Sequence, residues 1–127
     1  MSRNYFTDDK PEIIRNIVNE KQELVGYFCY GEAARIPTVE AYRYSDDQLD
    51  IGLGMQPEHC GKGEGEAFVT YGLYYMMKKY PDLPIRLTVA SFNQRAITVY
   101  KRIGFCIQNT VTHKISKQSF YIMLLEL

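Results

Sequence analysis

The chain has 127 residues, which suits a single folded domain (1–127) with one hydrophobic core and leaves no room for a second. Hydrophobic residues make up 46% of it and charged residues 24%, values typical of a soluble globular protein. Lys plus Arg and Asp plus Glu number 15 each, so the net charge gives no support for binding to nucleic acid or to an acidic membrane.

The first segment, 8–20, fits two structures. Asp9 and Pro11 are typical of a helix start, and the apolar residues that follow them fall on one helical face. The stretch IIRNIV is also rich in β-branched residues, and NEKQE would make a plausible hairpin turn into the next strand. The residue pattern leaves the helix and the hairpin both open.

Three strands are expected next, at LVGYFCY (24–30), VEAYRY (39–44) and LDIGLGM (49–55). The third alternates cleanly, with four large apolar residues on one face and Asp50, Gly52 and Gly54 on the other. Two glycines on one strand face usually indicate a bulge or a close approach by another group.

The second half predicts two helices and three strands. A helix is expected over 65–80, because EAFVTYGLYYMMKKY carries two overlapping apolar stripes and Pro81 stops it. IRLTVA (85–90) is a strand, and NQRAITVYKRI is a short helix that Asn93 could cap and Gly104 terminates. FCIQNTVTHKI and SFYIMLLEL are two strands joined by a turn near 116–119. This order predicts an α/β fold, a mixed sheet with one crossover whose helix follows a glycine loop.

The loop PEHCGKGEGE (57–66) places Gly61, Gly63 and Gly65 between strand 49–55 and the long helix. Glycines before a helix N-terminus allow an anion to approach unpaired backbone N–H groups, although a flexible turn is the alternative. A Walker loop is excluded because Lys62 is followed by glycine, and the dinucleotide fingerprint is excluded because Glu66 holds its sixth position.

Read with its flanks, the loop points to one family. GMQPEHCGKGEG, followed about thirty residues later by LTVASFNQRAITVYKRIGF, resembles the GCN5-related N-acetyltransferases, or GNAT family. The second segment fills the family pattern N-x-x-A-x-x-x-Y-x-x-x-G-F at every position, and the resemblance covers about 24–127. It implies a mixed, mostly antiparallel twisted sheet with a central parallel strand pair and flanking helices. It also implies a shortened N-terminus, which largely lacks the helices that line the acceptor site, in a short member or a fragment.

The resemblance implies acetyl-CoA as cosubstrate, with its pyrophosphate on the glycine loop. The residues that would bind it are Met55, Gln56, Cys60, Gly61, Lys62, Gly63, Glu64, Gly65, Asn93 and Tyr100. Cys60 departs from the family, which has Arg or Gln at the first loop position, and weakened binding is expected there. Asn93 would contact the pantetheine arm as well as capping its helix.

The implied reaction is attack of a primary amine on the acetyl thioester, which requires a held thioester, a deprotonated amine and a protonated thiolate. Tyr100 matches the family's general acid, although its place near an apolar helix face also suits a core aromatic. The backbone N–H near Met55 would polarise the thioester carbonyl. Asp50 is the only carboxylate within LDIGLGM and is the candidate general base, with a solvated strand residue as the alternative.

The remaining reactive side chains suggest no further chemistry. Cys29, Cys60 and Cys106 are odd in number and widely spaced, which suits neither a disulfide framework nor a metal site and favours a reducing, cytoplasmic location. His59 and His113 are isolated, and no spacing suggests a metal. No apolar run approaches the ~20 residues that span a bilayer.

The sequence therefore predicts an acetyl-CoA-dependent N-acetyltransferase whose partner is a small-molecule or peptide amine, with no nucleic acid, membrane or metal. A catalytically idle acyl-CoA-binding or regulatory domain is the alternative, because of the short N-terminus and Cys60. A nucleotide-binding module is a third hypothesis, which the missing motif positions disfavour. Apolar surface left by the short N-terminus would favour a homodimer.

Overall fold

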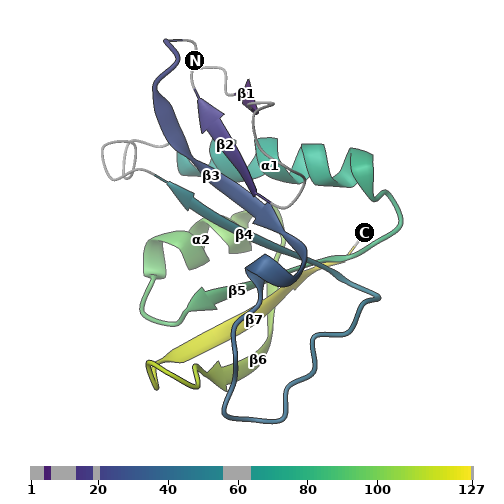
Figure 1. Cartoon of the computed structure of the whole chain (residues 1–127), viewed down its shortest axis with the longest axis vertical. Coiled ribbons are helices and arrows are strands. Elements are labelled where there is room, and N and C mark those ends of the chain that lie inside the picture. Colours follow the sequence, from purple (N-terminus) through teal and green to yellow (C-terminus); the bar gives the residue numbers. More distant parts are fainter. Residues whose placement is uncertain (1–4, 7–13, 19–20, 56–63, 127) are drawn as a thin grey trace.

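The computed structural model describes residues 5–6, 14–18, 21–55 and 64–126. Within these ranges seven strands form one sheet in the order β1-β2-β3-β4-β5-β7-β6 (Figure 1). Neighbouring strands are antiparallel except β4 and β5, which are parallel. The strands are β1 Tyr5–Phe6, β2 Ile14–Val18, β3 Leu24–Tyr30, β4 Leu49–Met55, β5 Ile85–Ala90, β6 Cys106–Thr112 and β7 Ser119–Leu125, and the helices are η1 Gly31–Ala34, α1 Gly65–Lys79 and α2 Gln94–Ile103. This architecture confirms the predicted fold class.

Both α-helices cover the same face of the sheet, which lies in front of them in Figure 1. Helix α1 packs so closely that a Cβ added to its Gly72 would lie 2.3 Å from the ring of Phe28 on β3. Phe28, Ile51, Met76 and Tyr100 belong to one buried cluster that joins β3, β4, α1 and α2. This core therefore lies between the sheet and the two helices, and it fixes the start of α1 beside α2.

The opposite face of β3 and β4 explains the two glycines in β4. Cys29 and Tyr27 of β3 pair with Gly52 and Gly54 of β4. A Cβ on Gly52 would lie 2.9 Å from the Cys29 sulfur, and one on Gly54 would lie 2.2 Å from the Tyr27 ring. The glycines therefore mark a close approach by cross-strand side chains, not a bulge, since the β3–β4 register is regular.

The N-terminal ambiguity is resolved in favour of the hairpin. Strand β2 pairs antiparallel with β3 through a turn that includes Gln22 with φ 65°. The helix alternative is wrong for Ile14–Val18, and the remaining residues of the proposed helix lie mostly outside the described ranges. Local pattern could not decide, because the deciding interaction is the pairing with β3.

The strand expected at 39–44 is absent, and this prediction is wrong. The segment contributes one isolated bridge, Thr38 with His113, and then crosses the sheet as irregular chain. Tyr42 and Tyr44 pack edge to face at 4.9 Å, and the Tyr44 hydroxyl lies 2.8 Å from that of Thr88 on β5. Their aromatic side chains are thus used for packing on the sheet rather than for strand pairing.

The other predicted elements are confirmed. Strands β3, β4 and β5 have the expected bounds, and α1 ends one residue before the predicted end. The Asn93 side chain caps α2 by accepting a hydrogen bond from the Ala96 N–H at 3.3 Å, and Gly104 ends the helix with φ 126°. Strands β6 and β7 form the C-terminal hairpin.

Candidate active site

The parallel strands β4 and β5 part halfway along their length. They pair only over Leu49–Ile51 and Ile85–Leu87. Strand β4 then continues beside β3 as far as Met55, while β5 continues beside β7 as far as Ala90. The sheet therefore opens between the second halves of β4 and β5.

The backbone of β4 turns hydrogen-bond donors toward this opening. Leu49 donates its N–H to the Pro84 carbonyl on the β5 side, at 2.9 Å. Because successive residues of a strand turn their N–H groups to alternate sides, the N–H groups of Leu53 and Met55 point the same way. This is the region in which the sequence predicted a donor to a thioester carbonyl.

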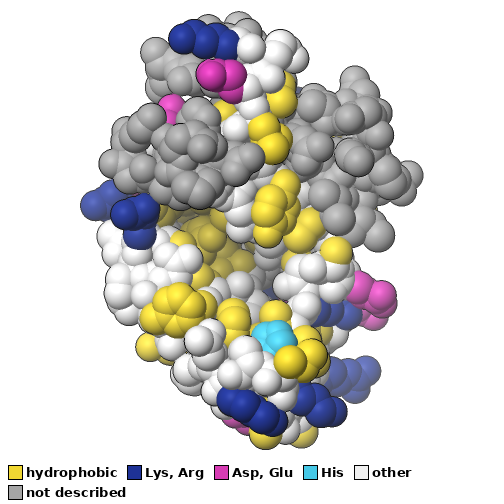
Figure 2. All heavy atoms as spheres, turned by 60° about the vertical axis from the view of Figure 1, so that its left-hand side comes forward, with side chains coloured by type: hydrophobic (Ala, Val, Ile, Leu, Met, Phe, Trp, Pro, Cys, Tyr) yellow, Lys and Arg dark blue, Asp and Glu magenta, His cyan; other side chains and the backbone are white. Residues whose placement is uncertain are grey.

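A cleft of about 1260 Å³ lies at the opening, between the end of β4 and the first turns of α1 and α2. Figure 2 shows a hollow on this side, with hydrophobic side chains on its floor and basic side chains along one rim. The cleft is larger than the ~300–1,000 Å³ of a pocket for a compact ligand. Four residues that the sequence assigned to cofactor binding lie in its wall, namely Met55, Gly65, Asn93 and Tyr100.

Among the described residues of this wall, Tyr100 is the one side chain that is both ionisable and deeply buried, with 6% of its surface exposed. Its ring packs against Phe105 with centroids 5.8 Å apart. Within the described part of the chain, no group hydrogen bonds its hydroxyl. Burial, and then the nearby Tyr27, raise the pKa of Tyr100 to about 12, so it keeps its proton at every physiological pH. A buried hydroxyl that has no partner among the described residues is expected to meet a ligand.

The cleft also meets the start of α1, where the helix dipole and N–H groups that have no partner within the helix favour an anion. A Cβ on Gly65 would lie 3.8 Å from Val99, so the first turn of α1 lies directly against α2. Glu64 precedes this turn as its N-cap residue. Gln56, Cys60, Gly61, Lys62 and Gly63, the other residues assigned to the cofactor, lie outside the described ranges.

Two arginines in the cleft wall were missed from the sequence. Arg95 and Arg102 both line it, and Arg102 lies 3.9 Å from Glu66 of α1 in an exposed ion pair. They are seven residues apart on α2, a spacing that places two side chains on one helical face. This spacing is visible in the sequence, but the family pattern specifies neither arginine.

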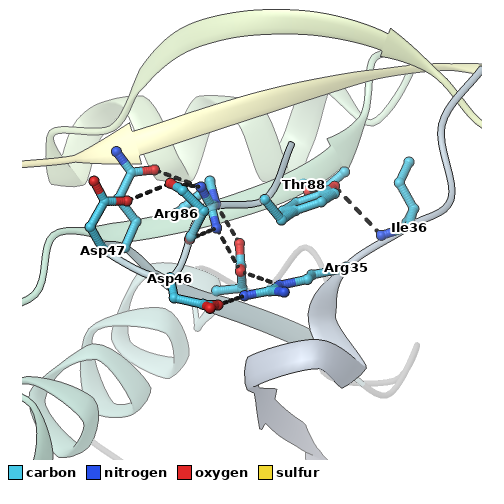
Figure 3. A network of polar contacts seen from close by, with 10 residues as sticks. Arg35, Ile36, Asp46, Asp47, Arg86 and Thr88 are labelled. Atoms are coloured by element: carbon cyan, nitrogen blue, oxygen red, sulfur yellow. Dashed lines mark hydrogen bonds and ion pairs between the residues drawn. The ribbon is translucent and has the colours of Figure 1, made fainter. Parts of the chain in front are cut away.

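Asp50, the candidate general base, lies at the other end of β4 and does not line the cleft. Arg86 of β5 donates from Nε and Nη2 to its two carboxylate oxygens at 2.6 and 2.8 Å. Arg35 donates from Nε to the second oxygen at 2.7 Å, and Asp46 holds the far side of Arg35 (Figure 3). The carboxylate is 2% exposed. The structure therefore makes Asp50 the centre of a buried ion cluster and does not bring it to Tyr100.

The described residues contain neither a metal-binding group nor a membrane-spanning helix. No three His, Cys, Asp or Glu side chains there are grouped so that they could hold a metal ion. None of the described helices has the length and apolar character needed to cross a membrane.

No protein-family model and no curated protein sequence matches the chain. Solved structures do match it. A GnaT-family acetyltransferase from Bordetella pertussis superposes with a TM-score of 0.69 at 11% identity, over 89% of this chain and 64% of that one. Spermidine N-acetyltransferase from Vibrio cholerae in complex with CoA and spermine gives 0.69 at 20%, over 88% and 63%. A mutant of the same enzyme gives 0.71 at 20%, over 93% and 66%.

The chain thus spans a little under two thirds of the length of these proteins. At such low identity the similarity concerns the path of the backbone, which includes the parallel pair β4–β5 and the two flanking helices. It agrees with the motif on α2 and with the element order that the sequence predicted. The chain therefore has the fold of the GCN5-related N-acetyltransferases.

Proposed function

We propose that the protein is an N-acetyltransferase that moves the acetyl group of acetyl-CoA to a primary amine. The observation that carries the proposal is the Tyr100 hydroxyl, which is buried, protonated and without a partner among the described residues, in the wall of an open cleft. The fold of known N-acetyltransferases supports it, as does the complex of one of them with CoA and spermine.

Each part of the cleft has a task in this reaction. The N–H group of Leu53 stabilises the negative charge that develops on the thioester oxygen. The N-terminus of α1, with Arg95 and Arg102 close by, attracts the phosphates of the cosubstrate. Tyr100 donates its proton to the departing sulfur. Acetyl-CoA supplies the activated acetyl group.

Asp50 has a structural role in this proposal. Its two oxygens already accept hydrogen bonds from two arginines, and its place at the base of the opening ties β4 to β5 where the strands part. The acceptor amine therefore loses its proton to water or to a group other than Asp50.

A catalytically idle acyl-CoA-binding domain is the second candidate function. One observation favours it, namely that Asp50 is held by two arginines and lies outside the cleft wall. An idle domain would retain the cleft but lack a base for the acceptor amine.

Turnover and binding separate the candidates. Purified protein is mixed with acetyl-CoA and spermidine, lysine amide or benzylamine, and free thiol is measured. Amine-dependent thiol release supports the enzyme, whereas binding of acetyl-CoA without release supports the idle domain. Melting temperatures with acetyl-CoA, ATP and NAD test the ligand class, because a ligand that binds only the folded state raises the melting temperature. A rise with ATP or NAD but not with acetyl-CoA contradicts both candidates.

Arg102→Gln should weaken acetyl-CoA binding by about fivefold at low salt, the effect of one exposed charge pair. The loss should shrink as salt screens the charge. Calorimetric titration measures both values. Arg43→Gln is the matched control, since Arg43 is exposed and belongs to the segment that follows η1, outside the cleft wall. Equal affinities for wild type and Arg102→Gln at low salt contradict a phosphate contact at Arg102.

A further inference from the structure

Tyr27 lies on the face of β3 that points away from the helices, directly opposite Gly54 of β4. Its ring lies over that glycine, because a Cβ on Gly54 would lie 2.2 Å from the ring and 3.0 Å from the hydroxyl oxygen. Gly54 itself lines the cleft. The hydroxyl of Tyr27 thus ends at the edge of the opening between β4 and β5, on the side opposite α1 and α2.

Packing explains the ring of Tyr27 but not its hydroxyl. A phenylalanine would cover Gly54 equally well, as aromatic residues commonly do across from a glycine in a sheet. Tyr27 is 48% exposed, and no group in the described ranges hydrogen bonds its hydroxyl. The oxygen is therefore available to a ligand at the edge of the cleft.

Tyr27 and Tyr100 approach the opening from opposite faces of the sheet. Tyr100 belongs to α2 and to the core under the helices, whereas Tyr27 belongs to the outer face of β3. After burial, Tyr27 is the one other group that raises the pKa of Tyr100. Gly54, which lies under the Tyr27 ring, and Tyr100 both line the cleft, so the two tyrosines meet the same cleft from opposite faces of the sheet.

We propose that Tyr27 is a positioning residue for the acceptor, whose hydroxyl oxygen accepts a hydrogen bond from the attacking amine. This inference rests on the proposed acetyl transfer. The hydrogen bond holds the nitrogen with its lone pair toward the thioester carbon, while Tyr100 serves the sulfur from the other side of the sheet. The acceptor amine enters from the outer face of β3 and β4.

The step balances without redox chemistry. The neutral amine nitrogen forms a bond to the acyl carbon, the carbon–sulfur bond breaks, and its electron pair goes to sulfur. Sulfur takes the Tyr100 proton, and the nitrogen loses its excess proton to water, from which Tyr100 is reprotonated. Tyr27 gains and loses no proton, so its contribution is the orientation of the amine.

Tyr27→Phe tests the inference, because it keeps the ring over Gly54 and deletes only the oxygen. With the fastest amine of the three above, the KM for the amine should rise by about tenfold, the effect of one lost hydrogen bond. Acetyl-CoA affinity and the melting temperature should stay unchanged, and kcat should change less than KM. Tyr74→Phe is the matched control, since Tyr74 is 54% exposed on α1 outside the cleft wall.

The outcomes separate this inference from the function on which it rests. An active wild type and a Tyr27→Phe variant with the same KM for the amine would overturn the role of Tyr27 alone. A wild type that releases no thiol with any of the amines would overturn acetyl transfer and this inference together. A raised KM in Tyr74→Phe as well would show a general effect of losing a tyrosine hydroxyl, and it too would overturn the role of Tyr27.

Discussion

Replacing Tyr100 with phenylalanine should slow the chemical step about 100-fold, the lower range for loss of a general acid. Phenylalanine keeps the ring, its contact with Phe105 and nearly all of its buried area. The hydroxyl acts only as the sulfur becomes an anion, so acetyl-CoA affinity should change little. Single-turnover acetyl transfer at saturating acetyl-CoA measures the rate, and a urea melt measures the stability of both proteins.

Tyr30→Phe is the matched control for Tyr100→Phe. Tyr30 has the same 6% exposure, but it lies on β3 outside the cleft wall, and its hydroxyl accepts a hydrogen bond from Lys79 at 2.9 Å. This variant should lose about 1 kcal/mol of stability and keep its activity. If Tyr100→Phe behaves in the same way, Tyr100 is a core residue, and water is the source of the proton.

The fold was predictable where the residue pattern of a segment matches the surroundings of that segment in the folded chain. The alternation of 49–55 predicts one face of large apolar residues, and in β4 that face belongs to the core or packs against it. The stretch 39–44 has strand composition but no place in the sheet, because its tyrosines pack on the sheet surface instead. Segment 14–18 was undecidable, since either structure would use the same apolar residues and only β3 selects the strand.

The site was predictable where it depends on one element. Asn93 and Tyr100 lie seven residues apart on or just before α2, so the helix itself brings both into the cleft wall. Tyr27 could not be found in this way, because only the β3–β4 register brings it to Gly54. The sequence predicted a bulge or a close approach at the glycines of β4, and the choice between them depends on pairing between distant segments.

The environment of Asp50 also depends on pairing between segments that are distant in the sequence. A single carboxylate on a strand that leads to a cofactor loop resembles a catalytic base when the strand is read alone. Its partner Arg86 is 36 residues away and becomes its neighbour only through the parallel pairing of β4 with β5. Buried charges are retained when they are paired, and here the pair joins the two strands directly before they part.

Asp50→Asn should therefore act on stability rather than on catalysis. Asparagine keeps the shape but removes the negative charge, which leaves the guanidinium of Arg86, 1% exposed, without the carboxylate that it binds. Breaking a buried pair in this way costs about 3–5 kcal/mol. At ~3 °C per kcal/mol for a domain of this size, the melting temperature should fall by roughly 10 °C.

The control for this substitution is Asp46→Asn, because Asp46 binds the same Arg35 at 3.0 Å while its side chain is 94% exposed. Because this ion pair is exposed, water solvates the Arg35 guanidinium after the substitution, so no measurable change in stability is expected. Asp50→Leu combined with Arg86→Met should be less destabilising than the sum of the two single changes, because no unpaired buried charge remains between β4 and β5. Thermal or urea melts of the whole set measure these differences.

Activity separates the structural role of Asp50 from the role of a general base. Measured well below its melting temperature and per folded molecule, Asp50→Asn should retain kcat within a few fold, because the carboxylate is absent from the cleft wall. Loss of a general base predicts the opposite, a fall of about 100-fold or more in kcat with little change in stability. A stable but inactive Asp50→Asn protein would thus indicate that Asp50 is the general base. It would contradict the purely structural role of its ion pairs with the two arginines.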